Sequence, residues 1–172
     1  MKKITRRIMT VMLSMMMVFA LSISAFADGM TQEQAMNIAL GDAGLAASDV
    51  IGLKVEADTE DGVFEVDFTN SKKTEYDYEI SAADGTIFEK SVEYKVARSK
   101  SKKKIGKKAA QKKVAKASGI EYSVVSKGSC KYKKSRKGGK YEIKFRSGGC
   151  KYEYEILASS GKVLEYDWEL IR

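Results

Sequence analysis

The chain of 172 residues contains no histidine and no proline, and it has only two cysteines and one tryptophan. Without histidine, Ser-His-Asp and Cys-His catalytic groups are excluded, and the commonest zinc ligand is missing. An enzyme would have to work with carboxylates, lysine or tyrosine alone. We therefore expect a protein that is not an enzyme, with no catalytic, cofactor-binding or metal-binding residues.

The two cysteines, Cys130 and Cys150, are even in number, which is typical of exported proteins with disulfide bonds. A simple antiparallel meander, however, places their strands two positions apart, at roughly 9–10 Å. A disulfide spans about 7 Å at most between Cα atoms. We expect two buried free thiols, with a Cys130–Cys150 disulfide as the alternative.

Residues 1–27 have the pattern of a secretory signal peptide. Four lysines and arginines precede an apolar stretch from Ile8 to Ile23, and Ala25 and Ala27 are the small residues that a signal peptidase recognises. We expect cleavage before Asp28 and a secreted or cell-envelope location, with an uncleaved membrane anchor as the alternative. No later segment is apolar enough to span a membrane.

Charge is divided unevenly between the two halves of the chain. Residues 28–94 contain 4 basic and 16 acidic side chains, whereas residues 95–172 contain 23 basic and 7 acidic ones. The halves are expected to attract each other, or the basic half to bind an anionic partner such as wall polymer or lipid. The residues predicted for such a contact are Lys100, Lys102, Lys103, Lys104, Lys107, Lys108, Lys112 and Lys113.

Two similar stretches, Glu75–Ile80 and Lys151–Ile156, alternate charged and apolar residues, and each precedes a turn with glycine. This period of two predicts strands with one buried face. The second copy indicates an internal repeat. We expect one domain at residues 28–94, a basic linker at 95–104 and a second domain at 105–172.

Helices are predicted over residues 31–43 and 105–118. Thr31 and Gln34 fit a capping box, while Gly44 and Gly119 are placed to end the two helices. The fold class is α+β, with two repeated units, each one helix on a three- or four-stranded antiparallel meander. Besides the two alternating stretches and residues 141–145, strands are predicted over residues 50–57, 63–69, 86–94, 124–134 and 163–170.

The first unit resembles a PepSY domain in the segment from Met30 to Gly44, in Tyr76-x-Tyr78-Glu79-Ile80 and in Asp84-Gly85. Residues 105–170 resemble a more divergent copy. The resemblance implies a cystatin-like α+β unit, related to the propeptides of thermolysin-like metallopeptidases. It also implies a non-catalytic role in binding or restraining an extracellular peptidase or peptide.

Two functions therefore remain open. One is an exported binding module for a peptidase or peptide, which edge strands of the sheet would bind by strand addition. The other is an envelope-associated protein whose basic half adheres to anionic wall polymer or lipid. Nucleic acid is not an expected partner, because an exported protein is separated from the nucleic acid inside the cell.

Overall fold

The computed structural model describes residues 29–97, 103–134 and 139–171. The predicted signal peptide and its cleavage site lie outside the described residues, as do Lys100 and Lys102. Within the described ranges, no helix has both the length and the hydropathy needed to cross a membrane.

Helix α1 (Gln32–Ala43) begins and ends where the sequence predicts. Thr31 Oγ1 accepts a hydrogen bond from the Gln34 backbone N–H (3.2 Å), and the Gln34 side chain accepts one from the Thr31 backbone N–H (2.7 Å). Gly44 ends the helix at φ 66°, a left-handed conformation that suits a residue without a Cβ atom. The capping box and the terminating glycine are thus confirmed.

A 3₁₀ turn (Ala47–Asp49) leads into four consecutive antiparallel strands. Their alternating residues behave as predicted, because Phe64, Val66 and Ile80 are fully buried on the side that α1 covers. The strands are β1 (Val50–Asp58), β2 (Val63–Asn70), β3 (Glu75–Ser81) and β4 (Ile87–Glu93).

The second half of the chain places helix α2 (Lys107–Ser118) on four further antiparallel strands. Gly119 ends α2 in the left-handed conformation, as predicted. Ala110 and Val114 of α2 are fully buried. The strands are β5 (Ser129–Lys133), β6 (Lys140–Ser147), β7 (Cys150–Leu157) and β8 (Val163–Leu170).

The predicted strand over residues 124–134 is wrong in its first part. Residues Tyr122–Val125 form a helical turn, α3, and β5 begins only at Ser129. Val125 is fully buried in the core beside α2, so packing overrides the preference of β-branched residues for strands. Gly128 then lets the backbone pass β6, because a Cβ atom there would lie 2.2 Å from the Lys144 carbonyl oxygen.

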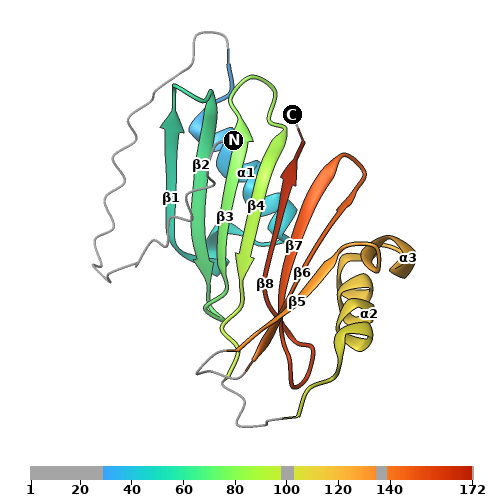
Figure 1. Cartoon of the computed structure of the whole chain (residues 1–172). Coiled ribbons are helices and arrows are strands. Elements are labelled where there is room, and N and C mark those ends of the chain that lie inside the picture. Colours follow the sequence, from blue (N-terminus) through green and yellow to red (C-terminus); the bar gives the residue numbers. More distant parts are fainter. Residues whose placement is uncertain (1–28, 98–102, 135–138, 172) are drawn as a thin grey trace.

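All eight strands belong to one sheet, in the order β1-β2-β3-β4-β8-β7-β6-β5 (Figure 1). The sequence leaves open whether the two halves contact each other; the structure joins them edge to edge through β4 and β8. The antiparallel register runs from Glu89 opposite Glu169 to Glu93 opposite Glu165. The predicted combination of helices and antiparallel strands is confirmed, but the two meanders form one sheet.

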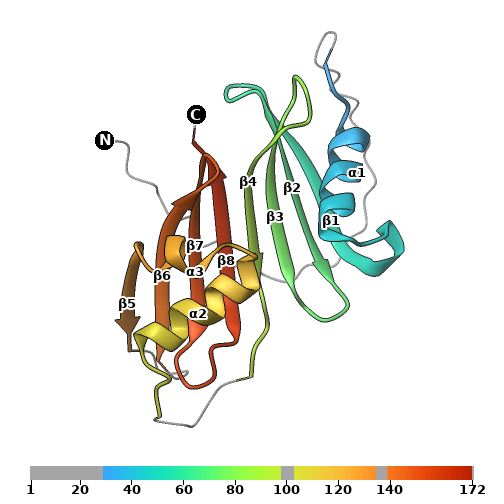
Figure 2. The same ribbon diagram turned by 90° about the vertical axis from the view of Figure 1, so that its right-hand side faces the viewer.

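The two helices lie on the same side of this twisted sheet, over its two ends (Figure 2). Val92, which faces the α1 side, is directly opposite Tyr166, which packs against the α2 core. Two separate apolar cores result. One joins α1 to β2 and β3, and the other joins α2 and α3 to β6 and β7.

Because the cores are separate, Ile80→Ala and Ile156→Ala should destabilise the chain independently. Both side chains are fully buried, so each truncation should lower the free energy of unfolding by about 2–5 kcal/mol. The two losses should add to within about 0.5 kcal/mol in chemical denaturation of the double variant. A larger coupling would show that the cores act as one.

Candidate functional site

The side of the sheet opposite the helices carries a dense group of carboxylates. Side chains alternate along a strand, so the residues between the buried ones point away from α1 and α2. In β2, β3, β4 and β8 most of these residues are acidic. We call this surface the acidic face; it comprises Glu65, Asp67, Glu75, Asp77, Glu79, Glu89, Glu93, Glu165, Asp167 and Glu169.

The strand register aligns these carboxylates across the sheet. Neighbouring strands lie about 4.8 Å apart, and like charges placed directly opposite one another are destabilising. The alternation of charged and apolar residues predicts a charged face within each half, but not that β4 and β8 join the two faces. Two rows place carboxylates opposite one another on consecutive strands of this face: Glu65-Glu79-Glu89-Glu169 and Glu75-Glu93-Glu165. On β7 the first row continues with Lys151, whose Nζ lies 2.8 Å from Glu169, and the second continues with Glu155.

The environment of this face raises the pKa of three of these groups, and for Asp67 the main cause is desolvation. Partial desolvation on the sheet, together with the charge of Asp67, raises the pKa of Asp77 to about 7. Desolvation, together with Asp167 and Glu155, raises the pKa of Glu165 to about 7. The acidic face thus holds more carboxylates than can ionise easily, and a bound cationic group would relieve their repulsion.

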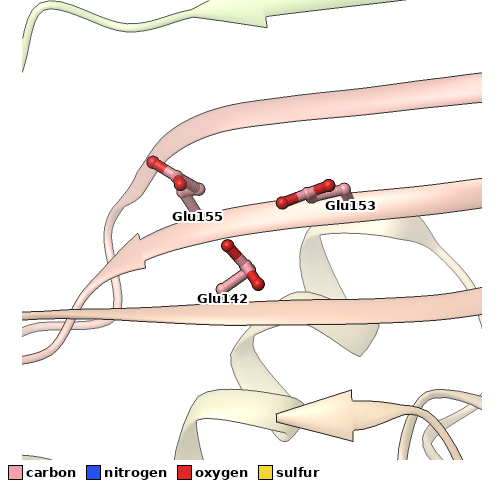
Figure 3. Close-up of side chains that lie close together, drawn as sticks. All are labelled: Glu142, Glu153 and Glu155. Atoms are coloured by element: carbon pink, nitrogen blue, oxygen red, sulfur yellow. The ribbon is translucent and has the colours of Figure 1, made fainter. Parts of the chain in front are cut away.

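Beside the acidic face, Glu142, Glu153 and Glu155 bring their carboxylate oxygens within 4.8 Å of one another (Figure 3). Such a group is chemically able to hold a divalent cation. Glu142 and Glu155 are only 5% and 4% exposed, however, so their charges need partners within the protein itself.

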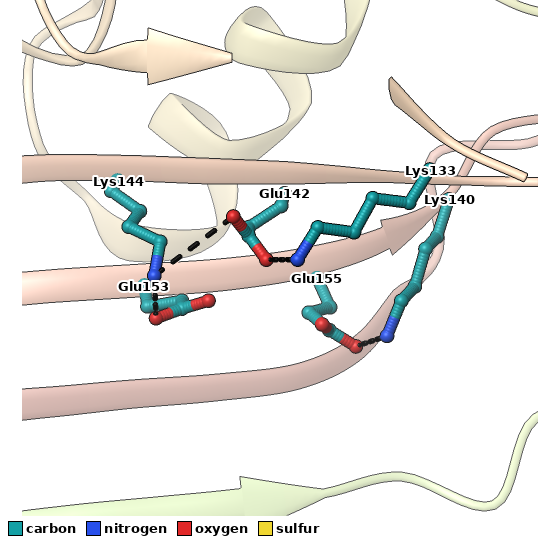
Figure 4. Close-up of polar contacts among 6 residues, drawn as sticks. All are labelled: Lys133, Lys140, Glu142, Lys144, Glu153 and Glu155. Atoms are coloured by element: carbon teal, nitrogen blue, oxygen red, sulfur yellow. Dashed lines mark hydrogen bonds and ion pairs between the residues drawn. The ribbon is translucent and has the colours of Figure 1, made fainter. Parts of the chain in front are cut away.

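Lysines supply those partners (Figure 4). Lys133 pairs with Glu142, and Lys140 pairs with Glu155. Lys144 Nζ lies 2.5 Å from Glu153 and 3.9 Å from Glu142. Three ammonium groups therefore neutralise the three carboxylates, and the arrangement favours a structural ion-pair network over a metal site.

The pKa of Glu142 reflects this network. Desolvation would raise the pKa, but the hydrogen bond from Lys133 and the charges of Lys144 and Lys133 outweigh it and hold the pKa below its usual value. Glu142 is therefore ionised at neutral pH.

On the helix side, Lys90 lies at the junction of the two halves and is only 8% exposed. Its Nζ lies 2.5 Å from Asp42 of α1, 5.2 Å from the Tyr78 ring centre and 5.8 Å from the Tyr166 ring centre. The charge is thus held by one carboxylate and by the faces of two rings. Lys90 was not predicted from the sequence, although a lysine at an inward strand position between Phe88 and Val92 indicates a buried charge.

A groove of about 350 Å³ lies next to this junction, between the C-terminal end of α2 and strand β8. Desolvation and the charge of Asp42 raise the pKa of Tyr166, which lines the groove, to about 12, so this phenol stays neutral. The groove offers stacking surfaces and no nucleophile beside a base. Its lining residues are Tyr94, Ala117, Ser118, Tyr152, Tyr154, Val163, Tyr166 and Trp168.

The lysines predicted to bind anions lie mainly on α2, on the helix side of the sheet. Lys107, Lys108, Lys112 and Lys113 are exposed, and so is Lys116 in the last turn. Lys103 and Lys104 precede the helix and are also exposed, with Lys104 Nζ 3.6 Å from the Tyr132 ring centre. The structure therefore brings most of these lysines together on one surface.

The two cysteines are free and half-buried. Cys130 on β5 is opposite Ile143 of β6, whereas Cys150 on β7 is opposite Ser147. The cysteines are therefore two strands apart and also displaced by four residues along β6, well beyond the reach of a disulfide.

Residues 29–90 match the family model described as "Peptidase propeptide and YPEB domain", or PepSY. An uncharacterized protein of Streptococcus pyogenes, Spy1430, is 44% identical over 66 residues, which are 37% of this chain and 50% of that protein. The chain thus matches about half the length of this curated relative.

Two solved structures are also similar. The YpeB C-terminal domain of Bacillus megaterium aligns with 80% of this chain and 62% of its own length, at 13% identity and a TM-score of 0.45. A cysteine-rich secretory protein of Staphylococcus aureus aligns with 78% of this chain and 43% of its own length, at 15% identity and a TM-score of 0.33.

The raised pKa values of Asp77 and Glu165 predict stability that falls with rising pH. An unfolded carboxyl has a pKa near 4, so the folded state holds more protons between about pH 4 and pH 7. The melting temperature should rise when the pH is lowered through this window. In the double variant Asp77→Asn, Glu165→Gln the melting temperature should change less with pH. An unchanged pH dependence of the melting temperature would contradict the raised pKa values of these two groups.

Replacing Lys90 with Met should lower the free energy of unfolding by about 1–3 kcal/mol, because Asp42 loses its cationic partner and keeps only the hydrogen bond from the Tyr78 hydroxyl (3.0 Å). The matched variant Asp42→Asn should lower the free energy of unfolding by at least as much, since it leaves the buried charge of Lys90 without its carboxylate. Chemical denaturation of both variants and the double variant measures the coupling. If the effects of the two changes simply add, the pair does not stabilise the junction.

Proposed function

Because residues 29–90 form a PepSY domain, we propose that this chain is a non-catalytic module that binds or restrains an extracellular peptidase or peptide. The family match carries this proposal, since the family is named for peptidase propeptides. We further propose that residues 1–27 direct export, in keeping with the extracellular or envelope location typical of such proteins.

We also propose that residues 105–172 are a second, divergent unit of the same kind, separated from the first by the basic segment 95–104. Met30 donates a backbone hydrogen bond to Ala82 (2.9 Å), and Ile105 donates the corresponding one to Ala158 (3.0 Å). The two cores use equivalent positions on equivalent strands, such as Tyr78 and Tyr154. These matches support two units that differ mainly in charge.

The open edges of the sheet are the surfaces suited to an extended peptide. Edge strand β1 has a register shift between Ile51 and Lys54, with Gly52 at φ 68°, and irregular edges of this kind resist pairing. Edge strand β5 pairs in regular register with β6 along all five of its residues. We therefore favour β5 for strand addition.

The direct test adds the purified chain to peptidases recovered from the medium of cells that produce it. We expect a complex of about micromolar affinity, near −8 kcal/mol, and reduced peptidase activity. The variant Lys108→Glu, Lys112→Glu, Lys116→Glu should bind equally well, because these exposed side chains lie on α2 and not on the edge strand β5. No complex and no change in any peptidase activity would reject the proposal.

Adhesion to an anionic surface is the second candidate, and the exposed lysines of α2 support it. In that case the chain should bind vesicles containing anionic lipid or purified wall polymer, and the triple α2 variant should be released. Salt should weaken this binding, since exposed charges are screened within about 8 Å at physiological ionic strength. The same variant therefore separates the two functions.

A further inference from the structure

Opposite charges occupy opposite sides of the sheet. The acidic face lies on the side of the sheet opposite the helices (Figure 2), whereas the lysines of α2 are exposed on the helix side. The sheet itself separates them, so the α2 lysines cannot reach the acidic face of their own molecule. No described helix covers the acidic face.

The two charged surfaces also have similar spacing. Lys108, Lys112 and Lys116 follow one line of the helix at intervals of four residues, which is about 6 Å along the axis. On β3, Glu75, Asp77 and Glu79 project from the same face at intervals of two residues, about 6.7 Å. A helix laid along the strand would place each ammonium near a carboxylate.

We propose that the acidic face binds the α2 surface of a second copy of this chain. The contact is head-to-tail, since different surfaces of the two molecules meet. The pair then keeps one free acidic face on one molecule and one free α2 surface on the other. Placing lysines between the carboxylate rows relieves the repulsion that the β4–β8 junction creates.

The size and nature of the two surfaces set the strength of this contact. Four strands at about 4.8 Å spacing and roughly 20 Å of strand length give about 400 Å². That is half of the ~800 Å² that each partner contributes to a stable interface. The association is therefore weak, reversible and strongly dependent on salt.

Sedimentation velocity of the full chain tests the proposal. At about 0.01 M salt the sedimentation coefficient should rise with protein concentration, and at about 1 M salt the chain should be monomeric. One variant reverses α2 (Lys108→Glu, Lys112→Glu, Lys116→Glu) and the other reverses the acidic face (Glu75→Lys, Asp77→Lys, Glu93→Lys). For each variant alone, the association constant should fall at least about tenfold.

Mixing the two variants is the decisive experiment. The acidic face of the first then meets the intact α2 of the second, and the reversed surfaces also match, so association should return. Because only folded proteins can restore it, the mixture also controls for misfolding, with circular dichroism of each variant as a second check. The variant Lys72→Glu, Lys127→Glu, Lys162→Glu has the same net charge as the first and should associate like the unmodified chain.

A chain that stays monomeric at low salt overturns the proposal and leaves the acidic face to a cationic partner of another sequence. So does association that both variants retain, or a mixture that fails to associate. Equal loss in the matched control would show that net charge alone, and not α2, drives the contact.

Discussion

The pairing of β4 with β8 is the interaction on which the rest of the structure depends. On one side of the sheet it places Glu89 opposite Glu169 and Glu93 opposite Glu165, which repel each other. The other side must supply the compensating free energy. There Val92 is fully buried opposite Tyr166, and Trp168 is opposite Lys90.

Lys90 shows how closely the two halves are connected at this point. Its ammonium group contacts Asp42 and Tyr78 of the first half and the ring of Tyr166 from the second. Tyr166 in turn stacks on Tyr154, with ring centres 5.5 Å apart. The junction is therefore held by rings and one buried charge, and the apolar cores lie on either side of it.

Joining the halves in this way creates surfaces that neither half has alone. The carboxylate rows are continuous because the register of β4 and β8 aligns them, and both helices lie on the other side. The half that contains the PepSY match and its basic neighbour thus form one sheet with an acidic side and a lysine-rich side. The proposals for anionic adhesion and for self-association both depend on this separation of charge.

Local features of the fold could be predicted from the sequence, because local physics determines them. Thr31 and Gln34 cap α1, glycines end both main helices, and alternating residues identify the buried side of each central strand. The prediction of a strand over residues 124–128 was wrong, since tertiary packing of Val125 overrides its strand preference.

Contacts between distant strands could not be predicted in the same way. An edge strand such as β4 can pair with any free edge, and nothing local specifies the register with β8. The full acidic face and the Asp42–Lys90 pair both depend on such contacts. Only parts of the candidate site could therefore be predicted from the sequence. The alternation of charged and apolar residues predicted a charged side for each half but not that the two sides are continuous.

Amide hydrogen exchange, measured residue by residue by NMR, tests the continuous sheet most directly. If β4 and β8 are central strands, the amides of residues 89–93 and 165–169 should exchange as slowly as those of β3 and β7, and more slowly than those of the edge strands β1 and β5. Fast exchange at β4 and β8 with slow exchange at β3 and β7 would show two separate sheets, and would contradict the account.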